Sequence, residues 1–325
     1  MSFQRNRVLR IAFGFSCVMW TVIFWSALPL SAQQERPFDL FGEPIDNIAI
    51  YRHYETVAVA KLPDKTDDAV QEFQMKLKQA DESCKLNLTE LESDALQPSG
   101  SLYEHMVKST IYIGELYNCG RCERTHAGFA GGVMIGKDGL ALTNYHVLQS
   151  RNSGKTEGIF AMTWDGKIWP IAEILAASIE HDVAVIRLGV PEDEGSDYQF
   201  HAAKIATEQP KPMEPVRIVS HPYGEFFVMT EGEVSRYARM RRPRVRQGQR
   251  QVWMEITAPF GSGSSGSGIF DEYGQVVGLV SSIRPLVRDP SKQGDEKSGA
   301  DKSYVEMLIR MCVPLNAIRS SFADN

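Results

Sequence analysis

A histidine, an aspartate and a serine, the side chains that together can cleave acyl bonds, follow one another along this chain in separate segments. His146 follows the segment LALTNY, Asp182 directly precedes the apolar run VAVI, and Ser265 lies in the glycine-rich stretch GSGSSGSG. A serine hydroxyl is a poor nucleophile at neutral pH, so a base must take its proton and a carboxylate must fix the tautomer of that base. Histidine suits this role because its pKa lies near neutrality. We therefore predict that His146, Asp182 and Ser265 form a catalytic triad.

Glycines beside Ser265 favour an oxyanion hole at the same place. Gly263 lies two residues before the serine and Gly266 directly after it. Glycine permits the tight backbone that points two N–H groups at a developing oxyanion, and the loss of one such donor costs roughly 3 kcal/mol of barrier. We expect the hole to be built by the N–H groups of Gly263 and Ser265, with Ser264 between them. A flexible Gly/Ser linker is the alternative, but β-type segments flank this stretch on both sides.

The chain order of the three residues separates two classes of hydrolase. A lone histidine is more often structural, and we interpret the other six histidines in that way. The order His, Asp, Ser is that of chymotrypsin-like enzymes, whereas α/β-hydrolases run Ser, Asp or Glu, His. The G-x-S-x-G signature of the hydrolases is also missing, because Ser267 stands two residues after Ser265.

Short β-type segments separated by turn residues follow one another from about residue 103 onward. Many short strands with a single terminal helix are typical of an all-β sandwich or a pair of barrels. We predict an all-β fold of two six-stranded antiparallel barrels, with a C-terminal helix at 314–322 and a helical segment at 66–93 before the barrels. That helical segment either packs on the main domain, which we favour, or acts in regulation or assembly. The predicted strands cover residues 109–116, 131–135, 140–143, 159–164, 183–188, 216–220, 226–236, 252–257, 275–282 and 304–313.

The first 32 residues have the features of a secretory signal peptide. Arg5, Arg7 and Arg10 precede an uncharged stretch at 11–30, and Ala32 offers a small residue for cleavage. The stretch of about 20 residues is also long enough to span a bilayer, so an uncleaved membrane anchor is the alternative. Either way we expect an exported protein, periplasmic or extracellular, with membrane contact only if this segment is uncleaved. We divide the chain into a signal peptide at 1–32, a helical extension and linker at 33–102, and the triad-bearing domain at 103–325.

Export affects how the cysteines are interpreted. The exported part holds Cys84, Cys119, Cys122 and Cys312, and an even number in an oxidising compartment suggests disulfides, in any of three pairings. Cys119-Gly-Arg-Cys122 could also be a redox pair or half of a metal site. The chain has no second CxxC and no thioredoxin-like pattern around this one, and His126 lies at the wrong spacing for haem attachment. We therefore expect no metal and no organic cofactor.

Three segments carry a resemblance to a known family. The segments GGVMIGKDGLALTNYHVL, HDVAVIRL and GSSGSGIFDEYGQVVGLV resemble the triad blocks of trypsin-like serine peptidases, closest to the bacterial HtrA-type branch. VRIVSHPYGE, MTEGEVSRYAR and the final VPLNAI resemble the connecting strands and closing helix of that branch. The resemblance covers about residues 104–324 and implies two barrels with the site between them, acting on polypeptides without a cofactor. We expect no PDZ domain after the closing helix.

The chain departs from that family next to the nucleophile. The family usually has Asn or Asp directly before the serine, where this chain has Ser264. It usually has Gly-Gly-Pro or Gly-Gly-Ala after the serine, where this chain has Gly266-Ser267-Gly268. Both changes fall in the loop that forms the oxyanion hole. The alternative function is therefore a catalytically weak or inactive protease fold that binds peptides or proteins.

The resemblance also implies which residues select the substrate. The floor of the primary specificity pocket would come from Pro259 and Phe260, and its wall from Ser281, Ser282 and Ile283. Because no acid occupies the floor, we expect small or medium apolar residues before the scissile bond.

The charge of the chain limits its partners. A formal net charge of -6 argues against a nucleic-acid-binding protein, which would carry a basic excess over a whole domain. A local exception is the loop from Arg239 to Arg250, which is rich in arginine and contains no acid. It is either a solvated surface loop or a binding site for an anionic effector.

Overall fold

The computed structural model describes most of the chain from Pro37 onward. The predicted signal peptide lies outside the described residues, as do Cys84 and the C-terminal part of the predicted 66–93 helix. None of the helices in the described part of the chain is long and apolar enough to cross a membrane. The described ranges are 37–63, 66–82, 100–150, 156–191, 198–241, 250–288 and 304–322.

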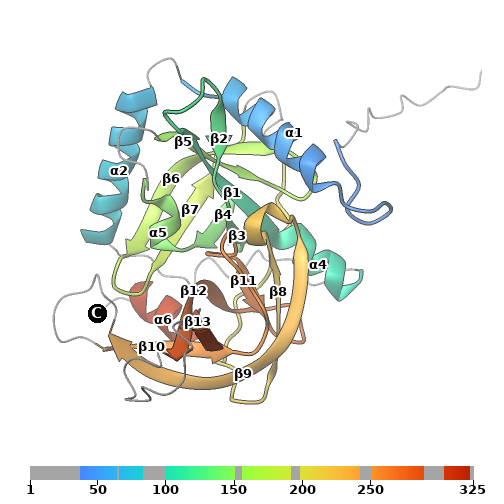
Figure 1. The fold of residues 1–325 in the computed structure, drawn as a ribbon, viewed down its shortest axis with the longest axis vertical. Coiled ribbons are helices and arrows are strands. Elements are labelled where there is room, and N and C mark those ends of the chain that lie inside the picture. The colour runs from blue at the N-terminus through green and yellow to red at the C-terminus, as the bar shows by residue number, and fades with distance from the viewer. Residues whose placement is uncertain are drawn as a thin grey trace, which may run out of the picture. The chain divides into compact units, whose positions relative to one another are not determined.

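Two rings of antiparallel strands make up the fold (Figure 1). In the first ring, pairing between the first and last strands closes the sheet, and a short edge strand, β2 (Thr125–Ala127), pairs with the first strand alone. The ring contains, in hydrogen-bonded order, β1 (Thr110–Asn118), β3 (Ala130–Met134), β4 (Leu140–Thr143), β7 (Val183–Leu188), β6 (Ile168–Ser178) and β5 (Thr156–Met162).

The second ring is a closed six-stranded barrel, followed by the C-terminal helix α6 (Leu315–Phe322). The predicted fold class, two six-stranded antiparallel barrels with a closing helix, is therefore confirmed. The second ring contains, in hydrogen-bonded order, β10 (Arg250–Ile256), β13 (Tyr304–Pro314), β12 (Val276–Arg288), β11 (Gly268–Phe270), β8 (Pro215–Ser220) and β9 (Val228–Arg241).

Strand β7 shows why the apolar runs of the sequence form interior strands. Val183 and Val185 belong to one buried cluster, and Ala184 and Ile186 belong to another. Side chains alternate between the two faces of a strand, so a strand buried on both faces is apolar throughout. The sequence does not reveal strands β2, β6 and β11. β2 and β11 have only three residues each, and Pro170 interrupts the apolar pattern of β6.

Two helices before the barrels pack on the first ring. The helix α2 (Thr66–Glu82) buries Leu77 and Ala80 and contacts β5 and β6, as the favoured interpretation of this helix expects. A helix that the sequence did not reveal, α1 (Asn47–Ala60), begins at Asp46, whose side chain accepts a hydrogen bond from the Ala49 N–H at 3.0 Å. Figure 1 shows both helices beside the strands of the first ring.

Tyr54 anchors α1 at the seam that closes the ring. Its side chain is fully buried, and its hydroxyl lies 2.8 Å from the Gly114 carbonyl of β1 and 3.0 Å from the Phe160 carbonyl of β5. A Cβ at Gly114 would lie within 2.6 Å of three atoms of the tyrosine ring, so only glycine leaves room there. The α1 helix is therefore an integral part of the packing of this barrel.

Replacing Tyr54 tests this packing. We expect Tyr54→Ala to lower the free energy of unfolding by about 3–5 kcal/mol, because it leaves a large cavity at the seam. Tyr54→Phe removes only the hydroxyl and should cost about 1 kcal/mol. The measurement is urea denaturation followed by tryptophan fluorescence. As a control, Ile48→Ala on the exposed side of α1 should stay within about 0.5 kcal/mol of the wild type. A Tyr54→Ala protein as stable as the wild type would contradict the docking of α1.

Candidate active site

The structure brings His146 and Asp182 together. His146 lies on the short helix α5 (Tyr145–Leu148) directly after β4, and Asp182 precedes β7, the neighbour of β4 in the sheet. The His146 Nδ1 lies 2.9 Å from both carboxylate oxygens of Asp182, and the His146 backbone N–H donates to Oδ1 at 3.2 Å. The Asp182 side chain is 1% exposed and that of His146 is 23% exposed. This contact holds the imidazole with a proton on Nδ1, which leaves Nε2 able to accept one.

The backbone at Asp182 takes an uncommon conformation to make this contact. Its φ is +59°, a left-handed value that Asp and Asn adopt more readily than other non-glycine residues. The Asn144 side-chain amide donates to the Asp182 carbonyl at 2.9 Å and so fixes the turn before β7. Asp182 is therefore held by its side chain and by its main chain.

Ser281, at a register shift in the pairing of β12 with β13, connects this pair to Ser265. Its hydroxyl donates to Asp182 Oδ2 at 2.8 Å, and its carbonyl accepts a hydrogen bond from Ser265 Oγ at 3.2 Å. Ser281 was predicted as part of the wall of a specificity pocket, and its contact with the carboxylate was not foreseen. Ser281 therefore contacts both Asp182 and Ser265. The Ser265 hydroxyl donates to the Ser281 carbonyl in this structure and not to His146.

The loop around Ser265 is fixed by backbone hydrogen bonds from several directions. The Ser265 carbonyl accepts from the Gly131 N–H of β3 at 2.7 Å, and the Gly266 N–H donates to Val280 of β12 at 2.9 Å. The Ser262 carbonyl accepts from the Tyr223 N–H at 2.7 Å. The carbonyl and the N–H of one planar trans peptide point in opposite directions. The bond from Tyr223 to the Ser262 carbonyl therefore turns the N–H of Gly263 away from Tyr223.

Two N–H groups of this loop remain available for a ligand. Within the described residues, neither the Gly263 N–H nor the Ser265 N–H has a hydrogen-bond acceptor. Ser264, between them, donates its N–H to the Gly261 carbonyl at 3.1 Å, so it contributes no donor. Gly263 has φ +98°, and a Cβ there would lie 2.5 Å from the His221 carbonyl oxygen, so this position requires glycine.

Ser264 and Ser267, two serines of this loop at which the chain differs from the family it resembles, have different surroundings. The Ser264 hydroxyl is buried and donates to Ser220 Oγ at 3.0 Å, which ties the loop to the end of β8. The Ser267 hydroxyl is buried without a hydrogen-bond partner among the described residues. A Cβ at Gly131 would lie 2.1 Å from this hydroxyl oxygen, so Ser267 fits only against a glycine. The Ser264 hydroxyl thus fixes the loop through a hydrogen bond, whereas the Ser267 hydroxyl has no hydrogen-bond partner in the described part of the chain.

Of the predicted substrate-binding residues, Pro259 and Phe260 directly precede this loop in the chain, and Ser281, Ser282 and Ile283 lie on β12. Pro259 is exposed and its carbonyl accepts from Thr230 Oγ1 at 2.7 Å, whereas Phe260 packs partly buried against the core. On β12, Ser282 is exposed and Ile283 is half-buried. β11 pairs with β12 only as far as Leu279, so the described strands leave one edge of β12 unpaired from Ser281 onward.

The arginine-rich loop is described only at its ends. Residues 242–249 lie outside the described residues, and β9 and β10 pair from Arg241 and Arg250 inward. Arg236, in β9, donates from Nε to the buried Glu255 of β10 at 2.7 Å, so it is paired with an acid that is far away in sequence. An anionic effector at the loop from Arg239 to Arg250 remains a prediction.

The described cysteines do not form the expected disulfides. Cys312 is fully buried in the second barrel, and the sulfurs of Cys119 and Cys122 are 3.4 Å apart, well beyond the about 2.05 Å of a disulfide bond. A backbone hydrogen bond from Arg121 and the contact with Cys122 lower the pKa of Cys119 to about 6. These three residues are therefore thiols or thiolates in this structure.

Comparison with known proteins agrees with this geometry. Residues 130–279, just under half of the chain, match the family model of the trypsin-like peptidase domain. His146, Asp182 and Ser265 all fall inside the matched residues. No curated protein matches the chain by sequence. The matched region is therefore similar to a trypsin-like peptidase domain, and the two-barrel fold agrees with this similarity.

Ser281→Ala tests the hydrogen bond that joins the two barrels at Asp182. A hydrogen bond to a charged group contributes about 1.5–3 kcal/mol, so we expect the free energy of unfolding at pH 7 to fall by about this amount. The matched control is Ser282→Ala, the same change at the adjacent exposed position, which should stay within about 0.5 kcal/mol of the wild type. Urea denaturation of both variants provides the comparison. Equal stability of the two variants would show that the Ser281 hydroxyl does not stabilise the buried carboxylate.

Proposed function

We propose that this protein is an exported serine endopeptidase of the HtrA-like branch, with His146, Asp182 and Ser265 as its catalytic triad. The observation that carries the proposal is the buried Asp182 carboxylate, which binds His146 Nδ1 and, through Ser281, lies next to Ser265. A carboxylate in this position fixes the tautomer of the imidazole and stabilises the imidazolium that forms during attack.

In the proposed reaction, Ser265 Oγ attacks the carbonyl carbon of the scissile peptide bond while its proton passes to His146 Nε2. For this the hydroxyl leaves the Ser281 carbonyl and turns towards the imidazole. Catalytic hydrogen bonds are often long or misaligned before substrate binds, so the contact with Ser281 is compatible with this role.

The negative charge that develops on the carbonyl oxygen would be stabilised by the N–H groups of Gly263 and Ser265. The tetrahedral intermediate then collapses, and the leaving amine takes the proton from His146. Water hydrolyses the acyl-enzyme in the second half of the reaction, with His146 again as the base.

The open edge of β12 supports a peptide as the substrate. An extended peptide can add to an unpaired strand edge through main-chain hydrogen bonds, and the unpaired edge of β12 from Ser281 onward begins next to Ser265. We propose that Pro259 and Phe260, together with Ser281, Ser282 and Ile283, bind the residue before the scissile bond.

Export is proposed on the sequence of the first 32 residues. The arginines at positions 5, 7 and 10, the uncharged stretch at 11–30 and Ala32 support a cleaved signal peptide. We propose a periplasmic or extracellular location on this basis.

A second candidate function is a peptide-binding protein that has lost catalysis. It is favoured by the contact of Ser265 Oγ with Ser281 in place of His146 and by the unpaired hydroxyl of Ser267. The two candidates differ in whether Ser265 reacts.

A fluorophosphonate probe distinguishes the two functions. We expect the folded wild type to be labelled covalently, because an activated serine attacks the phosphorus, and we expect Ser265→Ala to lose the label entirely. The matched control is Ser262→Ala, an exposed serine in the same loop, which should keep the label because its backbone carbonyl is retained. Intact-protein mass spectrometry measures the labelled fraction. A folded wild type without label would favour the peptide-binding protein.

Profiling with a peptide library tests the proposed specificity. We expect cleavage after small or medium apolar residues, because Pro259 and Phe260 offer no negative charge to a basic side chain. The cleavage sites are identified by mass spectrometry of the products, with Ser265→Ala as the control for contaminating proteases. Predominant cleavage after Lys or Arg would refute this specificity.

A further inference from the structure

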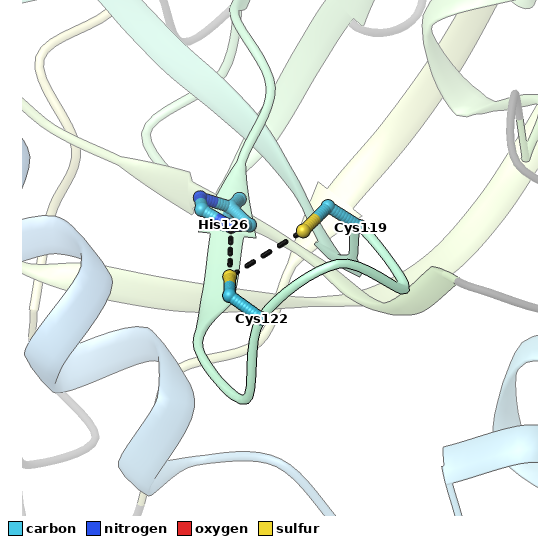
Figure 2. Close-up of side chains that lie close together, drawn as sticks. All are labelled: Cys119, Cys122 and His126. Atoms are coloured by element: carbon cyan, nitrogen blue, oxygen red, sulfur yellow. Dashed lines mark hydrogen bonds between the residues drawn. The ribbon is translucent and has the colours of Figure 1, made fainter.

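A second group of reactive side chains lies at the tip of the hairpin that joins β1 to β2. Figure 2 shows Cys119, Cys122 and His126 pointing towards one another. The Cys119 and Cys122 sulfurs are 3.4 Å apart, and Cys122 Sγ lies 3.1 Å from His126 Nε2. All three potential ligand atoms lie within 4.8 Å of one another. The sequence offers the C-x2-C motif only as half of a metal site. The structure places His126 beside it as a third potential ligand.

The separations of these atoms suit one tetrahedral metal ion. With Zn–S bonds near 2.3 Å and Zn–N bonds near 2.0 Å, tetrahedral angles place two sulfurs about 3.8 Å apart and a sulfur and a nitrogen about 3.5 Å apart. The observed 3.4 Å and 3.1 Å approach these values to within about half an ångström. Small side-chain rotations would make room for the ion.

The backbone of the turn is arranged around the first sulfur. The Arg121 N–H donates to Cys119 Sγ at 3.4 Å, and the Asn118 side chain accepts from the Gly120 N–H at 2.7 Å. Gly120 has φ +67°, which lets the chain reverse between the two cysteines. Backbone N–H groups directed at a thiolate are the outer contacts that hold metal ligands in place.

We propose that Cys119, Cys122 and His126 bind one Zn²⁺ ion, with a solvent molecule in the fourth coordination position. Thiolate and imidazole ligands favour zinc over hard cations such as Mg²⁺ or Ca²⁺. The exposed position of Cys122 gives the ion access from solvent. This site differs from the expectation of no metal, because the fold adds His126 to the CxxC pair.

The ion would fasten an edge strand that has few other contacts. β2 has three residues, and its only strand partner among the described strands is β1. An ion bound by Cys119 and Cys122 of the turn and by His126 of β2 would hold the hairpin together at its turn. The proposal is independent of the peptidase reaction, because none of the three ligands touches His146, Asp182 or Ser265.

Cobalt titration of the full chain tests the site. The protein is prepared without a polyhistidine tag, reduced, freed of metal with a chelator and titrated with Co²⁺. We expect one ion per chain, with thiolate-to-cobalt charge transfer and the visible bands of tetrahedral Co²⁺, both abolished by one equivalent of Zn²⁺. Cys122→Ser and His126→Ala should each weaken metal binding at least about 100-fold, because each removes a ligand, and even loss of an outer contact costs about 10–100-fold.

A control and two other outcomes make the test decisive. Cys312→Ala removes a thiol in the second barrel and should leave the cobalt spectrum unchanged, and zinc should raise the melting temperature of this variant but not that of Cys122→Ser. Metal binding that survives in both ligand variants would place the ion elsewhere and overturn the proposal. So would a reduced wild type that shows no charge-transfer band, in particular if the isolated protein carries a Cys119–Cys122 disulfide.

Discussion

A buried negative charge has to be surrounded by hydrogen-bond donors, and Asp182 meets this requirement where the two barrels join. Its carboxylate binds the side chain and the backbone of His146 from the first barrel and the hydroxyl of Ser281 from the second. Breaking a buried pair by removing one partner typically costs about 3–5 kcal/mol. The Asp182 carboxylate therefore constrains the relative positions of three segments: the helix after β4, the residues before β7, and the middle of β12.

The loop that carries Ser265 depends on the same junction. It is held by Gly131 of β3, Val280 of β12 and Tyr223 of the turn after β8, so strands of both barrels contribute to its shape. Gly263 makes this shape possible, since a side chain there would collide with the carbonyl of His221. His221 itself is a structural residue: it is fully buried, its Nδ1 accepts the Phe227 N–H at 3.2 Å, and burial lowers its pKa to about 3. In the proposed enzyme, the oxyanion hole is thus a product of packing between distant segments.

Two further elements, helix α1 and the short strand β2, pack on the first barrel. Helix α1 covers the seam between β1 and β5 through Tyr54, and the Ala127 N–H of β2 donates to Tyr51 of the same helix at 3.1 Å. The hairpin that holds the proposed zinc ligands is therefore stabilised from one side by α1. The proposed ion would fasten its other end.

The fold class and the three triad candidates follow from the amino-acid pattern alone. The bounds of β4 and β7 agree with the predicted strands residue for residue, because apolar runs between turn residues are local signals. The sequence did not reveal α1, whose Tyr54 is fixed by carbonyls of β1 and β5, or the contact of Ser281 with Asp182, which lies 99 positions away. It also did not indicate that the side chain of His126 meets those of Cys119 and Cys122. The contacts of Tyr54 and Ser281 depend on how segments far apart in the sequence pack against one another. The contact of His126 depends on how the β1–β2 turn folds the chain back, and no local apolar pattern signals either kind of contact.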